Sequence, residues 1–363
     1  VAAAEAQPPP AAATVAPSTL GGEGLIAGRA LEPGDCILQD AALATVERCP
    51  LAGAGLTELH EALCASGQRE QLLRAGPGRE LYRGQPEGGV AVRYGGWADA
   101  SAAELGAERE ACLEALLALA FNAYSSEPGD RYHIVYPIIS KANHSCAPNA
   151  WVLAPEAGPG VVRCSRPIGS GDEVTVSYLT TAQLSAPTGE RRRRLGRNWE
   201  FTCGCARCTA PADDARRFSC PQESCGGRCA APREGAPAAT PVRCDRCGRS
   251  PSSELLVEWG VLEEEIVGLL DGLPEALYAA WAPCEGFSGA HPSHWLAGRW
   301  KRHLAGHVEH EAATAEDAAE AAELREEAAG HAAAAKRCAE EMLGLPLERL
   351  ELPAPAPAGA LAA

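Results

Sequence analysis

Three short stretches decide the fold: residues 143–149 read NHSCAPN, residues 171–178 read GDEVTVSY, and residues 199–208 read WEFTCGCARC. The second stretch alternates apolar and polar residues, which predicts a strand that ends at Tyr178. The third stretch holds three cysteines that are too close together for ordinary disulfides, and thiolates at this spacing are typical zinc ligands. We therefore predict a strand-rich domain followed by a metal-binding segment.

A second set of cysteines follows as Cys220-x4-Cys225 and Cys244-x-x-Cys247. Two pairs separated by a loop are typical of a zinc-ribbon-like site, which is closed and structural and whose metal supplies folding energy. Cys229 is the alternative to Cys225 as a ligand. Residues 1–20 do not resemble a secretory signal, and clustered cysteine pairs in a reducing compartment indicate metal ligands. We therefore expect an intracellular protein, in the nucleus, the cytoplasm or both.

The charge of the chain limits the partners that it can have. Its 363 residues include 32 Lys and Arg against 48 Asp and Glu, which gives a formal net charge of −16. Binding to duplex DNA depends on neutralising phosphates, so we expect no direct duplex DNA binding and favour a basic partner, such as a lysine-rich protein tail.

No apolar stretch has the length of a membrane span. We expect a monomer, and because the chain begins with Val1 we expect that the true N-terminus is missing.

Composition divides the chain into segments with different expected structures. Residues 1–19 are rich in Ala and Pro and are predicted to be disordered. A domain is expected over 20–183, with a helical insert at about 51–120 where Leu and Ala recur at helical spacing. The remaining segments are 184–212 with the first zinc site, 213–252 with the zinc ribbon, a helical domain over 253–352 and a flexible tail over 353–363. The last helix is predicted near 312–342, where Ala and Glu dominate.

Arginine occupies all four positions from 191 to 194, and Arg197 follows on the same predicted helix. We interpret this run as a solvated helix face that positions the cysteine segment after it. A nuclear localisation signal is the alternative, because runs of basic residues also serve that purpose.

Three further stretches belong to the same pattern: GGEGLIAGRALEPGD at 21–35, FNAY at 121–124 and YPIISKA at 136–142. Together with the first three stretches, they resemble the SET-domain protein-lysine methyltransferases, specifically the SET-and-MYND branch. The resemblance covers about residues 20–250 and is looser beyond them. It implies an α+β fold: a SET-domain β-fold with a pseudoknot and a helical insert, a zinc-bound post-SET segment and zinc ribbon, and a C-terminal tetratricopeptide-like helical domain.

The resemblance also implies a function, S-adenosylmethionine-dependent methylation of a lysine in a histone or another protein. Tyr178 would be catalytic, and Tyr136 and Trp199 would line the substrate channel. The cofactor would be bound by Gly24, Asn122, Asn143, His144 and Phe201. The first zinc site would combine Cys146 of NHSC with Cys203, Cys205 and Cys208, and the second would use Cys220, Cys225, Cys244 and Cys247. Loss of the first zinc should then abolish cofactor binding, since Cys146 lies in the cofactor segment.

The chemistry of methyl transfer fits these residue types. The reaction is an in-line displacement at a sulfonium methyl, so positioning should supply most of the acceleration. A free lysine amine has a pKa of about 10.4, and a narrow apolar channel favours its neutral form by desolvation. The hydroxyl of Tyr178, at a strand end, would orient that amine and polarise the methyl group.

The sequence departs from the SET-and-MYND branch in several places. Cys49 and Cys64 lie where its MYND finger is expected, without Cys-x-x-Cys pairs, so we expect the partner binding of that finger to be absent. Glu23 stands where relatives often carry Asn, Lys or Arg near the cofactor carboxylate, and Lys141 replaces a usually apolar residue. Trp199 stands where relatives often have tyrosine, which leaves the number of methyl groups open. These departures support an alternative function, a catalytically inactive SET scaffold that binds partners.

Overall fold

The computed structural model describes residues 12–47, 90–106, 108–127, 131–237, 240–272 and 291–344. This part of the chain forms two compact units. The first holds the residues up to Tyr178 together with Arg194–Thr202, and the second holds Leu179–Arg193 and the residues from Cys203 onward. None of the helices in these ranges is long and apolar enough to cross a membrane.

The largest sheet of the first unit has four strands in the order β1-β2-β10-β7. Their bounds are Ala13–Pro17, Glu23–Ala27, Glu173–Val176 and Asn143–His144. β10 follows the alternation of its sequence, because Val174 and Val176 are buried in the core while the residues between them are half-buried. β10 pairs antiparallel with β2 and parallel with β7, so that Val176 lies opposite His144. The first two sequence stretches are thereby neighbours in one sheet.

The strand β1 corrects the prediction that residues 1–19 are disordered. It pairs antiparallel with β2, with Ala13 opposite Ala27 and Pro17 opposite Glu23. Ala12 and Ala13 are buried, and the Ala12 N–H donates to the Ile37 carbonyl at 2.8 Å. Composition hid this strand because small side chains can fill a tight core position and the sheet itself supplies the backbone hydrogen bonds. Residues 1–11 lie outside the described ranges.

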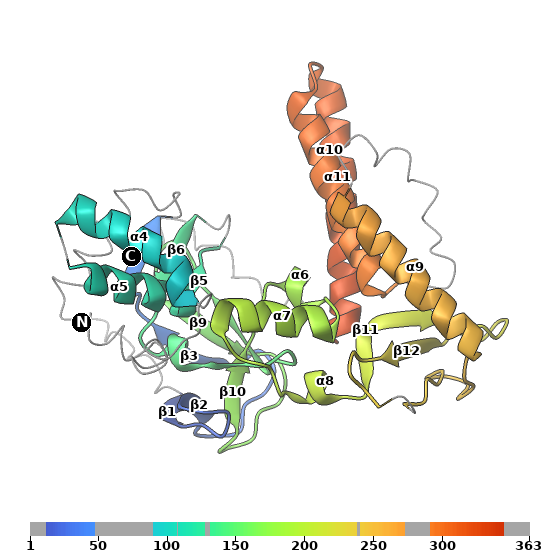
Figure 1. Cartoon of the computed structure of the whole chain (residues 1–363), viewed down its shortest axis with the longest axis horizontal. Coiled ribbons are helices and arrows are strands. Elements are labelled where there is room, and N and C mark those ends of the chain that lie inside the picture. Colours follow the sequence, from blue (N-terminus) through green and yellow to red (C-terminus); the bar gives the residue numbers. More distant parts are fainter. Residues whose placement is uncertain are drawn as a thin grey trace, which may run out of the picture. The chain divides into compact units, whose positions relative to one another are not determined.

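Two further antiparallel sheets complete the first unit. One has the order β3-β9-β8 over Cys36–Asp40, Gly160–Cys164 and Ala150–Leu153, and the other has the order β4-β6-β5 over Ala44–Glu47, Tyr132–Val135 and Ala123–Ser125. The helices α4 (Val90–Leu105) and α5 (Arg109–Asn122) lie side by side in the predicted insert (Figure 1). Positions 51–89 of that insert, and the place expected for a MYND finger, lie outside the described ranges.

The second unit combines a small sheet with helices. Strands β11 and β12 form an antiparallel pair, and the helices α6 to α8 precede them, with α7 continuing into residues of the first unit. Helices α9, α10 and α11 follow. In chain order the bounds are Thr181–Leu184, Thr188–Trp199, Ala206–Thr209, Ala212–Ser219, Arg228–Pro232, Ser253–Gly272, Trp295–Thr314 and Ala318–Leu343. The predicted α+β class is therefore confirmed, and the predicted likeness of the C-terminal helices to tetratricopeptide repeats stays a prediction.

Helices α10 and α11 lie side by side (Figure 1). α11 confirms the last helix predicted near 312–342, but it begins only at Ala318 because a break separates it from α10. α10 ends at Thr314, and Asp317 caps α11 by accepting hydrogen bonds from the N–H groups of Ala319 and Glu320 at 2.7 and 3.0 Å. Helix propensity alone missed this break, because Ala and Glu favour a helix on both sides of the cap.

The sheet of the second unit packs on α9 and α10 through aromatic and polar contacts. Phe218 of β11 stacks on Trp259 of α9, with ring centroids 4.4 Å apart. The buried Glu263 of α9 accepts hydrogen bonds from Arg216 Nε at 2.8 Å and Trp295 Nε1 at 2.7 Å. A buried carboxylate that is paired in this way stabilises the arrangement of these three elements.

Candidate active site and cysteine clusters

The parallel pairing of β7 with β10 places His144 beside Tyr178. The His144 ring is 6% exposed, and its Nδ1 accepts a hydrogen bond from the backbone N–H of Tyr178 at 3.0 Å. Because Nδ1 acts as an acceptor, the neutral ring carries its proton on Nε2, which lies 3.2 Å from the sulfur of Cys146. One imidazole therefore connects the strand of the predicted catalytic tyrosine with a predicted metal ligand.

Asn143 is held by two hydrogen bonds in a defined orientation. Its Nδ2 donates to Oε1 of Glu173 at 2.7 Å and to the carbonyl of Glu23 at 3.0 Å. The Glu173 carboxylate also accepts from the Ser18 hydroxyl at 2.8 Å. Both amide hydrogens of Asn143 are thus used within the protein, and the amide presents its oxygen as an acceptor. Sequence reasoning missed Ser18 and Glu173, and only Glu173 lies in a quoted motif.

Gly24 is required by packing at this site. A Cβ atom on Gly24 would lie 2.4 Å from Oε1 of Glu173 and 3.0 Å from Cβ of Ser18. Any side chain would therefore displace the carboxylate that orients Asn143. The structure thus gives one reason for a glycine here, the lack of space for a side chain. The reason given from the sequence, close approach of the backbone to a cofactor, stays a prediction. Asn122, the last residue of α5, is buried at 7% exposure.

Three aromatic rings surround the predicted catalytic residue, Tyr178. The ring of Tyr178 lies 5.3 Å from that of His144, 5.5 Å from Trp199 and 6.3 Å from Phe201 between centroids. His144 and Phe201 are 5.9 Å apart. The structure therefore brings together four residues that sequence analysis assigned to the cofactor site, the channel and catalysis. Such a cluster offers an apolar surface in which a cationic or neutral amine loses water.

The hydroxyl of Tyr178 is a hydrogen-bond donor at neutral pH. It donates to the carbonyl of Ala142 at 3.0 Å. Burial, together with the negative charge of Glu173, raises the pKa of Tyr178 to about 12. The phenol therefore stays protonated under physiological conditions, and it can orient or polarise a group but cannot act as a general base.

Two more tyrosines, Tyr124 and Tyr136, belong to the same unit as this cluster. Tyr136 is fully buried in the core of the first unit, against Gly160, whose added Cβ would lie 2.6 Å from the Tyr136 ring. Tyr124 lies 6.1 Å from Tyr136 between centroids, and its hydroxyl donates to the Ile139 carbonyl at 3.4 Å. Burial and the neighbouring Tyr178 and Tyr136 hydroxyls raise the pKa of Tyr124. The role of Tyr136 in a channel stays a prediction, and Tyr124, which stood unremarked in FNAY, joins the candidate residues.

Glu23 and Lys141, two of the departures noted in the sequence, form an ion pair. Lys141 Nζ lies 2.7 Å from Oε2 of Glu23. Glu23 opens β2, and Lys141 ends the short 3-10 helix η1 (Ile139–Lys141) just before β7. The side chain of Lys141 is 15% exposed and that of Glu23 is 56% exposed. The charge of Glu23 is therefore balanced at the edge of the candidate site.

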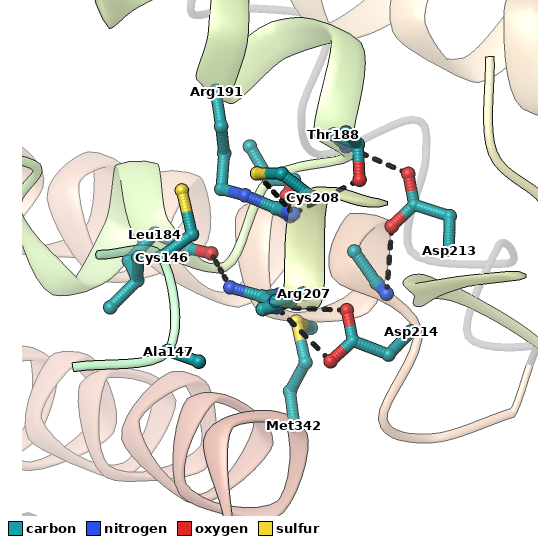
Figure 2. A network of polar contacts seen from close by, with 12 residues as sticks. Cys146, Ala147, Leu184, Thr188, Arg191, Arg207, Cys208, Asp213, Asp214 and Met342 are labelled. Atoms are coloured by element: carbon teal, nitrogen blue, oxygen red, sulfur yellow. Dashed lines mark hydrogen bonds and ion pairs between the residues drawn. The ribbon is translucent and has the colours of Figure 1, made fainter. Parts of the chain in front are cut away.

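The first cysteine cluster comprises Cys146, Cys203, Cys205 and Cys208, whose sulfur atoms all lie within 4.8 Å of one another. Cys208 contacts Arg191, which is fully buried (Figure 2). Arg191 Nη2 lies 3.0 Å from Thr188 Oγ1 and 3.6 Å from Cys208 Sγ, and Nη1 donates to the carbonyl of Ala186. This burial corrects the interpretation of the arginine run as a solvated face at its first residue.

Figure 2 also shows how neighbouring groups fix this corner of the second unit. Asp213 accepts from the backbone N–H of Thr188 at 2.7 Å. Arg207 donates through Nη1 to the carbonyl of Leu184 at 2.7 Å and through Nε to Asp214 at 2.9 Å. Two guanidinium groups thus bring positive charge to the segment that carries three of the cysteines, which suits thiolates.

The second cysteine cluster comprises Cys220, Cys225, Cys244 and Cys247. Its sulfur pairs lie 3.6 Å apart for Cys220 with Cys247 and 3.7 Å apart for Cys225 with Cys244. Four thiolates about 2.3 Å from a tetrahedral zinc lie about 3.8 Å apart, so the spacing fits this metal. Cys229, by contrast, is fully buried in the apolar cluster of Phe218 and Trp259. The structure therefore favours Cys225 over Cys229.

Comparison with known proteins agrees with this geometry. Residues 22–179 match the family model of the SET domain. The chain is 37% identical over 101 residues to the histone-lysine N-methyltransferase ASHR1 of Arabidopsis thaliana, covering 26% of this chain and 20% of that protein. It is 32% identical over 111 residues to the N-lysine methyltransferase SMYD2 of Mus musculus, covering 28% and 25%.

A third relative is the protein-lysine N-trimethyltransferase SMYD5 of Danio rerio, 30% identical over 119 residues, which cover 31% of this chain and 29% of that protein. The chain thus spans between a fifth and three tenths of the length of these curated relatives.

Proposed function

We propose, from the premise that this chain is a SET-domain protein related to the SMYD and ASHR1 proteins, that it methylates lysine side chains of a protein with S-adenosylmethionine as methyl donor. The observation that carries the proposal is the surrounding of Tyr178. A protonated, half-buried phenol stands among aromatic rings, one strand away from the oriented amide of Asn143.

The residues present fit the cofactor. The oxygen of Asn143 is available as an acceptor for an ammonium group, and Phe201 beside His144 supplies a flat apolar surface for an adenine ring. Bound S-adenosylmethionine would supply a methyl group on a positively charged sulfur. The aromatic cluster would remove water from that charge and from the incoming amine, which must be neutral to attack.

Tyr178 has a positioning role in this proposal. Its hydroxyl keeps its proton at neutral pH, so the proton released by the lysine ammonium leaves to solvent before the amine enters the cluster. The phenol would then orient the neutral amine toward the methyl group that bound S-adenosylmethionine would supply. The net charge of −16 suits a basic segment of a histone or another protein as substrate.

Both cysteine clusters are proposed to bind structural zinc. Closed sets of four thiolates are typical of such sites, and metal binding at each site would supply folding energy. His144 connects the first cluster to Tyr178 through Nδ1 and through its contact with Cys146. Removal of that zinc should therefore disturb the candidate active site. We further propose that the protein works inside the cell, where thiols stay reduced.

The alternative, a catalytically inactive scaffold, rests on Trp199. Its indole lies against the Tyr178 ring and is larger than the tyrosine that relatives often have. If the indole blocks the approach of a lysine, the site would bind the cofactor without turning it over.

Methyl transfer onto protein distinguishes these functions. Zinc-loaded protein is incubated with tritium-labelled S-adenosylmethionine and core histones or an array of lysine peptides. The proposal expects label on lysine, which disappears in Tyr178→Phe while the affinity for S-adenosylhomocysteine is kept. If the protein binds S-adenosylhomocysteine but labels neither the core histones nor the lysine peptides, the result would favour the inactive scaffold.

A further inference from the structure

Two departures from the family pattern carry opposite charges and meet in space. Glu23 and Lys141 are 118 residues apart in the sequence, yet Lys141 Nζ lies 2.7 Å from Oε2 of Glu23. Each residue taken alone is unexpected at its position, an acid where a cofactor carboxylate would lie and a cation in an apolar segment. Their contact makes the two residues one unit in the structure.

The pair borders the candidate cofactor site on two sides. The carbonyl of Glu23 accepts the hydrogen bond from Asn143 Nδ2 at 3.0 Å, and Glu23 precedes Gly24. Lys141 precedes Ala142, whose carbonyl accepts the Tyr178 hydroxyl at 3.0 Å. Backbone atoms beside both charged residues are therefore fixed by side chains of the site itself.

The two side chains differ in their freedom to move. Lys141 is 15% exposed, so neighbouring residues cover its aliphatic chain and hold its ammonium group at the edge of the site. Glu23 is 56% exposed and can swing into solvent. An ion pair with one well-hydrated partner contributes little to stability, so a ligand carboxylate can replace Glu23 at the ammonium group.

The charges around the Asn143 amide show why a cation is needed. The Glu173 carboxylate accepts from the neutral groups of Ser18 and Asn143, so no cation in these contacts balances it. Glu23 adds a second carboxylate. The amino-acid end of S-adenosylmethionine carries an ammonium, which suits these acids and the oxygen of Asn143, and a carboxylate, which they would repel. Lys141 supplies the positive charge for that carboxylate.

We propose that Lys141 binds the carboxylate of the amino-acid end of S-adenosylmethionine, and that Glu23 holds its ammonium group in place until the ligand displaces it. The inference rests on the proposed function, because it assumes that this site takes the cofactor. It assigns the cation for the cofactor to the segment before β7, and it explains why an acid is tolerated next to Gly24.

Calorimetry with two ligands tests the assignment. S-adenosylhomocysteine has the amino-acid end, whereas methylthioadenosine has the same adenosine and sulfur without it. Both are titrated into zinc-loaded wild-type protein and into Lys141→Met, Lys141→Arg and Glu23→Gln. Lys141→Met keeps the length of the side chain and removes its charge. Lys301→Met on α10 is the matched control, because the chain has only two other lysines, Lys301 and Lys336.

The expected loss for Lys141→Met is on the order of tenfold in affinity for S-adenosylhomocysteine, since a hydrogen bond to a charged group is lost. Affinity for methylthioadenosine should stay within about twofold. Lys141→Arg should retain most of the affinity for S-adenosylhomocysteine, and Glu23→Gln should bind it at least as tightly as wild type, because a competing carboxylate is gone.

Three results would overturn the assignment. Unchanged affinity of Lys141→Met for S-adenosylhomocysteine would show that its carboxylate does not reach Lys141. Equal losses for both ligands would make Lys141 a structural residue. A loss in Glu23→Gln as large as in Lys141→Met would mean that the ion pair itself, and not its ammonium group, supports binding. Wild-type protein that binds neither ligand would instead reject the proposed function, and the assignment of Lys141 with it.

Discussion

The candidate active site and the zinc ribbon are built in different ways. Around Tyr178, strands from distant parts of the sequence meet, and Ser18, Asn143 and Glu173 form one hydrogen-bonded group. The ribbon instead gathers Cys220, Cys225, Cys244 and Cys247 from one short segment. The first region depends on the whole sheet, whereas the second depends on local spacing and on a metal. Four experiments, from the largest expected effect to the smallest, test this difference.

Removing a zinc ligand should have the largest effect. Cys225→Ala should lower the zinc content from two ions to one per chain and unfold the loops that carry the four cysteines, because metal binding supplies folding energy there. The matched variant Cys229→Ala removes a buried cysteine of the same segment that contacts Phe218 and Trp259. It should keep both ions and lose only a small amount of stability. Zinc is measured by mass spectrometry of the metal after gel filtration, and equal zinc loss in both variants would contradict the ligand set.

Tyr178→Phe should have a large effect on turnover and little on structure. Loss of the hydroxyl removes the hydrogen bond to the Ala142 carbonyl and the group that orients the amine. We expect kcat to fall by about a hundredfold, with affinity for S-adenosylhomocysteine almost unchanged. Because the pKa of Tyr178 is raised to about 12, the activity of the wild type should show no loss from phenol ionisation below that pH. An equal loss of turnover and of ligand affinity would make Tyr178 architectural.

Two arginines of the same helix should differ in their contribution to stability. Arg191→Met removes the buried hydrogen bonds to Ala186 and Thr188 and the contact with Cys208, and should lower the free energy of unfolding by about 3 kcal/mol. Arg193→Met removes a side chain that is 64% exposed and pairs only at the surface with Glu190, so its effect should be close to zero. Urea unfolding of the zinc-loaded variants measures both. Similar values for the two would contradict the burial of Arg191.

The cap of α11 should give the smallest effect. Asp317→Ala removes the oxygen Oδ1 that accepts from two backbone N–H groups, and Asp317→Asn keeps an oxygen at that position. These hydrogen bonds lower the pKa of Asp317 below its usual 3.8. A carboxyl whose folded-state pKa is lowered stabilises the fold at neutral pH, and this contribution is lost as the pH falls from 3.8 through the lowered pKa. The difference in melting temperature between wild type and Asp317→Ala should therefore shrink in acid, and a constant difference would contradict the capping role.

The sequence predicted features that depend on neighbouring residues. Alternating residues predicted the strand before Tyr178, and cysteine spacing predicted the second cluster and three members of the first. The fourth member, Cys146, was predicted only from the family resemblance. The position of Cys229 was left open, because spacing alone cannot tell a ligand from a core residue. The structure separates the two cases, because the sulfur of Cys225 is grouped with those of Cys220, Cys244 and Cys247 whereas Cys229 is not in that group.

Several features that depend on tertiary contacts were not predicted. The strand β1 needs its partner β2, and the burial of Arg191 needs Cys208 and the carbonyl of Ala186. Glu23 and Lys141 each counted against a working cofactor site until their contact was known. The effect of a charged or small side chain depends on which residues it contacts in the folded protein. Those contacts cannot be read from a single sequence.

Binding of S-adenosylhomocysteine to the zinc-loaded protein, measured by calorimetry with Asn143→Ala as the control, tests the central claim most directly. The Asn143 amide is oriented by Glu173 and Glu23, so its removal should abolish a specific ligand contact without disturbing the core. We predict one ligand per chain with micromolar affinity in the wild type and a large loss in the variant. Absence of binding by folded wild-type protein that carries both zinc ions would contradict the account.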